Sequence, residues 1–531
     1  MNKKKRFLAL TVAALMSASL FVGCQKNNGQ GSSEVGTNKP QSTGKKVDGG
    51  TFIYPVESDV TSLNVWYESG DEGFTMLKPL YDPLYVTSST GTRYYLAESY
   101  DVSDDGLTIN IKLNKNAKWH DGKPITADDL IFTFDVKNNP VNKSSSGTTI
   151  KKKPVKYEKV DDYTVKFTLP EVSASYISTL GNIKMIPKHI YEGEASVATS
   201  EKNKLGIGSG PYKVQEWKTG TSLSLTRFED YYRGVPNLKN LVFKVIPEFS
   251  AQEVALQSGE ISVMRVPTNE KLKKYSTDDK YNVWSIPEGR NNYMGFNSNS
   301  KKMKDIKARQ AIAMALNCDE IIAGAYGDKL AVRGENILNP ENIIYDDSVK
   351  GYEQDLEGAK KLIAELGLDK EPIKLIYNSS RVNMEDCALI IQQQLKEVGI
   401  TVEITGYETQ GFFEQFFYST DGSWDLGLNG YASNADPNGN TGMFQSGMYL
   451  AKNICTSEAT GNLWAKADAT IDEAERKALY GEIERAVKDE YTIYPVSMPN
   501  FVLVADKKFQ GLDEIKMVPV FEDYLKLYMT E

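Results

Sequence analysis

The chain has 531 residues, of which 40% are hydrophobic and 25% are charged. This length exceeds that of one ordinary domain, and the composition excludes fibrous and disordered proteins. The formal net charge is −9, so there is no surplus of basic side chains to neutralise phosphates, which argues against a nucleic-acid partner. We therefore expect a globular protein with two or more substructures.

The N-terminus has the layout of a secretory signal, because the basic stretch Lys3–Arg6 precedes the apolar run Phe7–Val22. This run is shorter than the roughly 20 residues that span a bilayer. It is followed by Gly23 and Cys24, which resemble the lipobox of bacterial lipoproteins, with Phe21 in place of the usual leucine. We expect cleavage before Cys24 and lipidation of its thiol, which would anchor the protein on the extracytoplasmic face of the bacterial cell membrane. The alternative is cleavage elsewhere, with Cys24 as a free thiol.

Residues 24–48 are predicted to be a flexible tether that begins at the lipidated cysteine. After Cys24, Val35 and Val47 are its only aliphatic side chains, so the segment cannot bury enough surface to offset its ordering entropy.

From Thr51 onward the pattern predicts alternating strands and helices. Apolar residues alternate with polar ones in three short segments, which predicts half-buried strands at Leu107–Leu113, Tyr163–Leu169 and Leu241–Val245. Thr126 and Asp129 precede an apolar run with the spacing of a capping box, so a helix is predicted to begin there. Asp305 is predicted to cap a second helix.

A strand, a helix and a strand follow one another at Ile373–Tyr377, Met384–Val398 and Ile400–Ile404. This order favours a parallel pair with a right-handed crossover. Ligands bind such sheets beyond the carboxyl ends of the strands, so the loop Asn378–Arg381 is a candidate ligand loop, with Arg381 as its charged residue. The alternative for Arg381 is a solvated surface charge.

The three remaining cysteines, Cys318, Cys387 and Cys455, are an odd number and lie far apart, so no disulfide framework is predicted. The chain has two histidines, His120 and His189, and neither lies in a metal-ligand pattern or a catalytic triad motif. We therefore expect no catalytic residue, no metal site and no cofactor.

The segment Ala117–Leu130, which reads AKWHDGKPITADDL, resembles the signature of the extracellular solute-binding proteins of peptide and nickel ABC importers. Further motifs of that family follow in the expected order along nearly the whole chain after the tether. They are Leu96–Gly106, Gly208–Tyr212, Tyr231–Pro236, Leu256–Ile261, Asn292–Asn297 and Ala308–Ala313.

The resemblance implies an α/β, two-lobed, periplasmic-binding-protein-like fold whose lobes are joined by two hinge strands and close over a ligand. The expected first lobe comprises residues 49–290 and 500–531, with an extra subdomain inserted at about 66–205. The expected second lobe comprises residues 291–499, including the hinge segments. Residues 1–23 form the expected signal peptide.

The resemblance also nominates ligand-binding residues. In peptide-binding members a segment of the form Gly-Trp-x-x-Asp-x-x-Asp/Glu-Pro lies at the cleft, and its first carboxylate pairs with the peptide α-ammonium group. The counterpart here is Gly430–Pro437, one residue shorter, in which Asp436 fits the second acid and Ser433 or Asn434 replaces the first. Either Asp436 takes over the role or the ligand lacks a free α-amine; the alternative for Asp436 is capping the turn at Pro437.

Four further residues complete the predicted ligand site. Tyr431 and Trp424 are candidates for aromatic walls of the cleft, with core packing as the alternative for each. Ser69 and Asp71 align roughly with a ligand loop of the first lobe.

The function implied by the family is capture of short peptides and their delivery to the membrane subunits of an ABC permease, by a monomeric binding protein that is not an enzyme. An alternative within the family is an oligosaccharide or another ligand without a free amine. A secreted hydrolase is disfavoured, because neither histidine lies in a catalytic motif.

Overall fold

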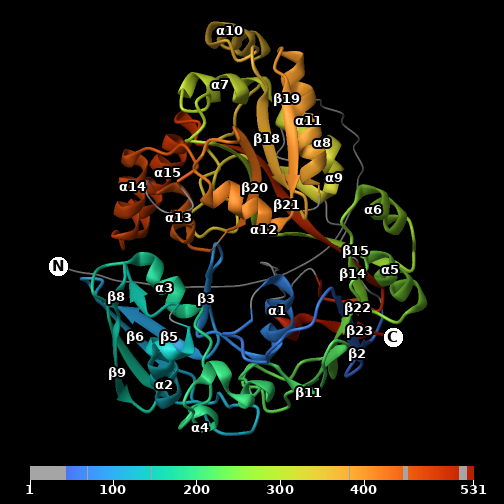
Figure 1. Cartoon of the computed structure of the whole chain (residues 1–531). Coiled ribbons are helices and arrows are strands. Elements are labelled where there is room, and N and C mark those ends of the chain that lie inside the picture. Colours follow the sequence, from blue (N-terminus) through green and yellow to red (C-terminus); the bar gives the residue numbers. More distant parts are fainter. Residues whose placement is uncertain are drawn as a thin grey trace, which may run out of the picture. The chain divides into compact units, whose positions relative to one another are not determined.

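The computed structural model describes residues 44–68, 70–144, 146–381, 383–433, 435–445, 452–512 and 523–531 (Figure 1). The predicted signal peptide, Cys24 and most of the predicted tether lie outside the described residues. No helix among the described residues is both long enough and apolar enough to cross a membrane.

A four-stranded sheet with the order β11-β12-β13-β2 forms one part of the fold. Its strands are β11 (Tyr212–Lys218), β12 (Ser222–Arg227), β13 (Asn240–Val245) and β2 (Thr51–Val56). The predicted strand at Leu241–Val245 is β13, in which Leu241 and Phe243 face a buried core. Helix α1 (Gly70–Leu77) follows β2 in the chain, and α5 (Phe249–Ser258) and α6 (Asn269–Ser276) follow β13.

A second, antiparallel sheet has the order β5-β6-β10-β9. Its strands are β5 (Ala97–Val102), β6 (Thr108–Leu113), β10 (Thr164–Thr168) and β9 (Lys156–Asp161), and the nearby short elements are β3 (Tyr85–Ser88), β4 (Gly91–Tyr94), β7 (Thr149–Ile150), β8 (Lys153–Pro154), α2 (Ala127–Asn138), α3 (Ala174–Gly181) and α4 (Lys188–Tyr191). The alternating segments predicted as strands are β6 and β10, which bury one face each. The predicted capping box also forms, because the Asp129 carboxylate accepts a hydrogen bond of 3.0 Å from the Thr126 amide.

The third sheet has eight strands. The six on its main path are β14 (Val263–Arg265), β21 (Ile493–Asp506), β16 (Arg290–Phe296), β20 (Leu426–Ala432), β18 (Ile373–Asn378) and β19 (Val402–Tyr407); β15 (Tyr281–Pro287) and β17 (Ala331–Arg333) also pair with β21. The pair β18 and β19 is parallel, as predicted. The helix between them, α11 (Met384–Glu397), ends before Gly399, whose φ of +91° suits glycine.

The remaining helices surround the β16, β18, β19 and β20 part of this sheet (Figure 1). They are α7 (Ile306–Ala315), α8 (Cys318–Ala325), α9 (Gly327–Leu330), α10 (Leu356–Leu366), α12 (Thr409–Phe413), α13 (Thr441–Phe444), α14 (Glu458–Asp468) and α15 (Glu473–Asp489). Asp305 caps α7 as predicted, because its side chain accepts from the Lys307 amide at 2.9 Å. We call this part of the molecule the second lobe, and the part with the two four-stranded sheets the first lobe.

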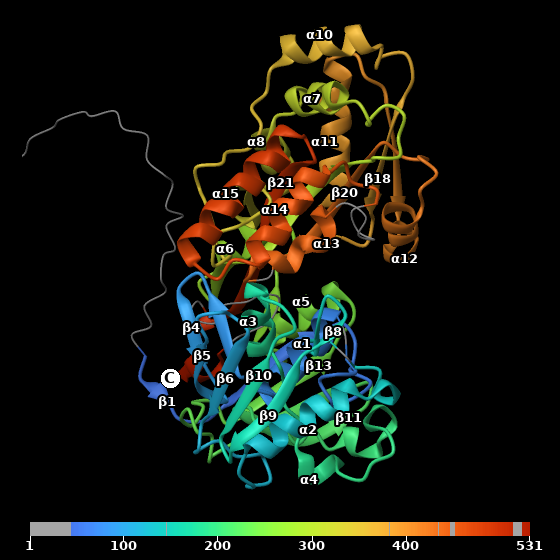
Figure 2. The same cartoon turned by 90° about the vertical axis from the view of Figure 1, so that its left-hand side faces the viewer.

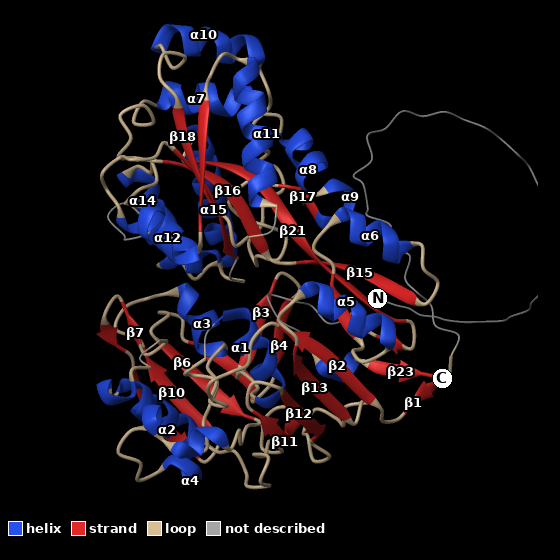
Figure 3. Ribbon diagram, turned by 45° about the vertical axis from the view of Figure 1, so that its right-hand side comes forward, coloured by secondary structure: helices blue, strands red, loops and turns tan. Residues whose placement is uncertain are grey.

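Strand β21 connects the two lobes (Figure 3). Its first half pairs with β16 and β17, and its second half pairs with β14 and β15. The turn Pro287–Arg290 joins β15 to β16 beside it. Two neighbouring chain segments therefore cross between the lobes at the same place. A further, short sheet of β1 (Lys46–Val47), β23 (Tyr528–Thr530) and β22 (Phe509–Gln510) brings the C-terminal strand back to the first lobe.

His120 has a structural place in the first lobe. Its Nδ1 accepts a hydrogen bond of 3.1 Å from the Gly208 amide, and its Nε2 lies 3.1 Å from the Gly210 carbonyl oxygen. These partners select the neutral tautomer that carries its proton on Nε2. Burial lowers the pKa of His120 to about 4. The ring thus joins the segment Ala117–Leu130 to the segment Gly208–Tyr212.

Candidate functional site

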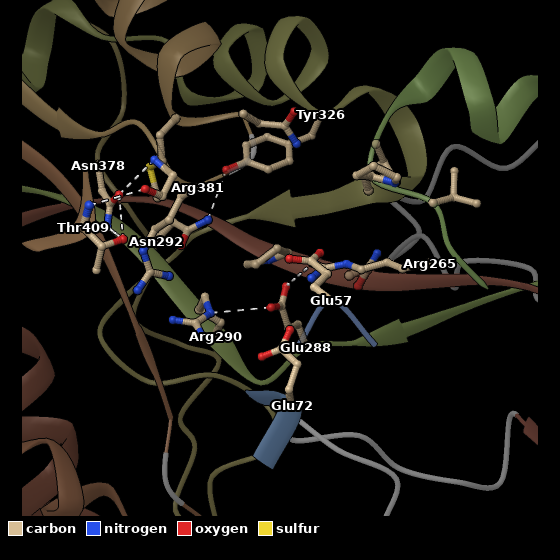
Figure 4. Close-up of a pocket in the computed structure, with 18 residues that line it drawn as sticks. Glu57, Glu72, Arg265, Glu288, Arg290, Asn292, Tyr326, Asn378, Arg381 and Thr409 are labelled. Atoms are coloured by element: carbon tan, nitrogen blue, oxygen red, sulfur yellow. Dashed lines mark hydrogen bonds and ion pairs between the residues drawn. The ribbon is translucent and has the colours of Figure 1, made fainter. Parts of the chain in front are cut away.

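A cavity of about 470 Å³ lies where β16 and β21 cross between the lobes (Figure 4). This volume falls within the roughly 300–1,000 Å³ range of ligand pockets. The first lobe contributes residues at the end of β2 and on α1, the crossing strands form the floor, and the loop after β18 forms the opposite wall. The polar and charged lining residues are Glu57, Glu72, Arg265, Glu288, Arg290, Asn292, Asn378, Ser380, Arg381, Asn383, Thr409 and Asn500.

Glu288 organises the charged floor of this cavity. Its carboxylate accepts a hydrogen bond of 3.3 Å from Arg265 and forms an ion pair of 3.6 Å with Nε of Arg290. The Glu288 side chain is buried, whereas that of Arg265 is 42% exposed. The guanidinium of Arg265 also lies over the ring of Phe501, 4.4 Å from its centroid. One carboxylate therefore holds two guanidinium groups beside the cavity, and both keep contact with solvent.

The loop after β18 is held by its own hydrogen bonds. The Asn378 side chain accepts from the Ser380 amide at 3.0 Å, and the Asn378 carbonyl accepts from the Arg381 amide at 3.2 Å. Ser380 donates in turn to the Glu408 carboxylate at 2.6 Å. This fixed turn lies beyond the carboxyl end of β18 and places Arg381 on the cavity wall, as the parallel-sheet argument led us to expect.

Asp436 lies elsewhere in the second lobe, in the loop that leads into a short 3₁₀ helix (Pro437–Asn440). Its two carboxylate oxygens each lie 2.8 Å from a guanidinium nitrogen of Arg476 on α15, and both side chains are about 5% exposed. One oxygen also accepts from the Asn438 amide at 3.0 Å, so Asp436 caps the turn at Pro437. Asp436 is not among the residues that line the cavity.

Residues 92–449 match the model of the bacterial extracellular solute-binding proteins, family 5 Middle. The chain belongs to this family. Its members are extracellular solute-binding proteins. The match covers the second sheet, the β18–β19 unit and the part of the cavity lining that lies between residues 265 and 409.

One similar protein and two similar solved structures agree with this membership. The oligopeptide-binding protein AppA of Bacillus subtilis strain 168 is 31% identical over 453 residues, which cover 80% of each chain. A crystal structure of the ABC transporter substrate binding protein CtaP of Listeria monocytogenes is 36% identical, with a TM-score of 0.86, and the match covers 91% of this chain and 100% of that one. The structure of AppA of Bacillus subtilis in complex with a nonapeptide matches with a TM-score of 0.73 at 26% identity, covering 92% of this chain and 100% of that one. The two-lobed fold expected from the sequence is confirmed.

Two other predicted site residues, Trp424 and Tyr431, lie away from the cavity. Trp424 is 1% exposed, stacks on Phe416 with ring centroids 5.1 Å apart, and donates to the Gln415 carbonyl at 3.0 Å. Tyr431 donates from its hydroxyl to the Ile337 carbonyl. Both rings pack in the second lobe's aromatic cluster, which matches the packing alternative, and neither lines the cavity.

The predicted polar residues are only partly described. Ser433 is buried, and its hydroxyl donates to the Asn342 side chain at 3.1 Å. Asn434 and Ser69 lie outside the described residues. Asp71 lies on α1, but its side chain is outside what the structure describes. The roles of these residues in ligand binding stay predictions.

Five charged residues of the cavity were missed by the sequence analysis. They are Glu57, Glu72, Arg265, Glu288 and Arg290. One signal could have found two of them: Glu288 and Arg290 directly precede the recognised segment Asn292–Asn297, at the expected hinge. Arg265 and Glu72 come from elements distant in sequence, and no local pattern brings them to the same place.

Proposed function

We propose that this chain captures short peptides in the cavity at the crossing strands and delivers them to the membrane subunits of an ABC permease. The observation that carries the proposal is the joint presence of carboxylates and guanidinium groups around one cavity within a fold shared with oligopeptide-binding proteins. AppA of Bacillus subtilis, which is similar over the same fold, is named as an oligopeptide-binding protein and has been solved with a nonapeptide.

The charges of the cavity complement those of a peptide. A free peptide carries an ammonium group and a carboxylate, and each needs an opposite charge or several hydrogen bonds to replace its hydration. Glu57, Glu72 and Glu288 supply carboxylates toward the first lobe, and Arg381 supplies a guanidinium on the second lobe. A ligand with both charges can therefore bridge the two lobes.

Hinge closure is part of the proposal. We place the first lobe at residues 49–290 and 500–531, with its inserted subdomain at about 66–205, and the second lobe at 291–499. The hinge then lies in β16 and β21, directly beside the cavity. A ligand held by Arg381 and by the Glu288 cluster contacts both sides of that hinge, so its binding energy favours the closed arrangement.

The sequence alone supports a lipid-anchored N-terminus. Residues 1–23 act as a signal peptide, Cys24 carries the lipid, and residues 25–48 tether a monomeric binding protein to the outer side of the cell membrane. Two or more acyl chains are needed for a stable anchor, since one alone binds a membrane only marginally.

Isothermal titration with a mixed set of dipeptides to nonapeptides tests the proposed ligand. We expect binding heat with at least one peptide class and a loss of that heat in Arg381→Met. N-acetylated versions of the binding peptides then show whether a free α-amine is required. No heat with any peptide at micromolar protein would overturn the peptide proposal.

A further inference from the structure

A carboxylate of the second lobe caps a helix of the first lobe. Asp468, the last residue of α14, accepts hydrogen bonds from the Ser175 amide at 3.1 Å, from the Ser175 hydroxyl at 2.7 Å and from the Ser173 hydroxyl at 3.0 Å. These donors lie at the N-terminus of α3, 293 and 295 positions away in sequence. Asp468 is 8% exposed, so the contact is well shielded from water.

The two helices belong to different cores. Tyr176 and Leu180 of α3 pack into the core of the antiparallel β5-β6-β10-β9 sheet. Trp464 and Ala467 of α14 pack into the aromatic core of the second lobe. Figures 1 and 2 both show α14 facing α3 from the other lobe. The hydrogen bonds of Asp468 therefore join two cores that the crossing strands also link.

The N-terminus of α3 is suited to this contact. The first amides of a helix lack partners within the helix, and an aspartate placed there satisfies them and interacts favourably with the helix dipole. Ser173 occupies the N-cap position of α3, yet its own side chain makes no capping hydrogen bond. The capping group of this helix thus comes from the opposite lobe.

Two neighbouring contacts extend the same interface. The Asn438 side chain donates to the Ser175 hydroxyl at 3.3 Å, and Asn438 belongs to the loop that Asp436 and Arg476 fix in place. Just after α14, the Ile471 side chain lies so close to Gly106 that a Cβ on that glycine would be 1.9 Å from Cδ1 of Ile471. Asp468 is therefore the polar centre of a small interface with an apolar contact beside it.

We propose that Asp468 is a positioning residue for ligand retention: it holds the lobes closed by capping α3 and does so without touching the ligand. None of Asp468, Ser173 and Ser175 lines the cavity. Separation of the lobes breaks all of these hydrogen bonds together. The contact therefore stabilises the closed arrangement relative to the open one, whatever side chains the ligand has. The part of this inference that concerns ligand release rests on the proposed peptide-binding function.

The test compares Asp468→Asn with Glu458→Gln, a neutralised carboxylate in the exposed first turn of the same helix. In stopped-flow or surface plasmon measurements with a binding peptide, we expect Asp468→Asn to raise the dissociation rate about tenfold, because the substitution weakens hydrogen bonds to a charged acceptor that hold the lobes closed. The association rate is expected to change little, and Glu458→Gln to leave both rates unchanged. An unchanged dissociation rate in Asp468→Asn overturns the proposal.

A second arm does not depend on the ligand. Small-angle scattering of the unliganded protein is expected to show a larger radius of gyration for Asp468→Asn than for the wild type and for Glu458→Gln. Adding Ser173→Ala and Ser175→Ala to Asp468→Asn is expected to cause no further expansion, because these groups act as one unit. Equal radii of gyration in all variants contradict the closing role of Asp468, even if peptides bind. A larger radius in Asp468→Asn together with no binding of any peptide contradicts only the proposed peptide-binding function.

Discussion

Two carboxylates of the second lobe and the hinge, Asp436 and Glu288, are each held by arginine in different ways. Asp436 and Arg476 meet in two hydrogen bonds of 2.8 Å, with both side chains about 5% exposed. Glu288 lies 3.3 Å from Arg265 and 3.6 Å from Arg290, and Arg265 is 42% exposed. The Asp436–Arg476 pair fixes a loop. The Glu288 cluster leaves charged groups beside a cavity, where a charged group of a ligand can take the place of one of the ion-pair partners.

The difference has an energetic basis. A buried ion pair is held by short, paired hydrogen bonds, and loss of one partner leaves an uncompensated charge in a dry environment. A half-exposed pair can lose a partner to water or to a ligand at low cost. Sequence resemblance alone pointed to Asp436 as the ligand carboxylate, but the geometry assigns it first to Arg476.

The largest expected effect comes from breaking the buried pair. Arg476→Met leaves the Asp436 carboxylate without its charge partner, so we expect a loss of about 3–5 kcal/mol in the free energy of unfolding. Urea unfolding measures this loss. The double variant Asp436→Asn with Arg476→Met should recover a large part of it. A loss below about 1 kcal/mol in Arg476→Met contradicts the structural role given to the pair.

A third carboxylate, Glu484 on α15, extends the comparison because no arginine among the described residues is hydrogen-bonded to it. It is 1% exposed, and neither of its oxygens has a hydrogen-bond partner in the described structure. Burial, with the nearby Asp346 as a smaller cause, raises the pKa of Glu484 to about 8 from an ordinary value of 4.5. Between pH 4.5 and about pH 8 the folded protein keeps a proton on Glu484 that the unfolded chain has released. The contribution of Glu484 to the free energy of unfolding therefore decreases as the pH rises through this range.

We therefore expect Glu484→Gln to become more stable relative to the wild type as the pH rises from 5 to 8, by about 3 kcal/mol at most. Denaturant unfolding of both proteins at several pH values gives the difference directly. Other titrating groups are common to the two proteins and cancel. A difference that does not change with pH contradicts the assignment of a raised pKa to Glu484.

Arg381 tests the cavity side of the comparison. Arg381→Met removes a charged donor from the cavity wall, and we expect peptide affinity to fall about 10- to 100-fold, the loss of a hydrogen bond to a charged group. The free energy of unfolding should change by less than about 1 kcal/mol, since Arg381 is not fully buried. Calorimetric titration and urea unfolding separate the two readouts, and unchanged affinity contradicts the placement of the ligand.

The smallest expected effect concerns Glu288. Glu288→Gln weakens the two ion pairs at the cavity, and we expect a stability change of about 1 kcal/mol or less, because Arg265 is 42% exposed and the contact with Arg290 is a loose ion pair of 3.6 Å. Peptide affinity is expected to change several-fold, in either direction, as Arg265 and Arg290 become free to bind other groups. A stability loss as large as that of Arg476→Met would remove the distinction between the two regions.

Local patterns predicted much of the fold. The alternation at Leu107–Leu113 and Tyr163–Leu169 identified β6 and β10, and the strand, helix and strand at 373–404 gave a parallel pair. The same argument placed Arg381 at the carboxyl end of β18, where it lines the cavity. The strands and the parallel pair could be predicted because a repeat of two or of 3.6 residues, with a glycine at a helix end, is a local property of the chain. The role of Arg381 in ligand binding stays a prediction.

The rest of the site depends on contacts between distant residues. Nothing near Asp436 indicates that Arg476, 40 positions away, fixes both of its oxygens. Nor does a local pattern bring Glu72 of α1 to the same cavity as Arg290 of β16. The role of Trp424 could not be predicted from the local sequence either, because an aromatic residue beside a strand is equally compatible with a ligand-binding wall and with a packed core.

The central claim is that a peptide binds in the cavity at the crossing strands, with contacts to both lobes. A crystal structure of the protein with a peptide selected by calorimetry tests it most directly. We expect peptide density between Arg381 and the Glu288 cluster, with one peptide charge within hydrogen-bond distance of the Arg381 guanidinium. Well-defined peptide density at another place, with this cavity filled only by water, would contradict the account.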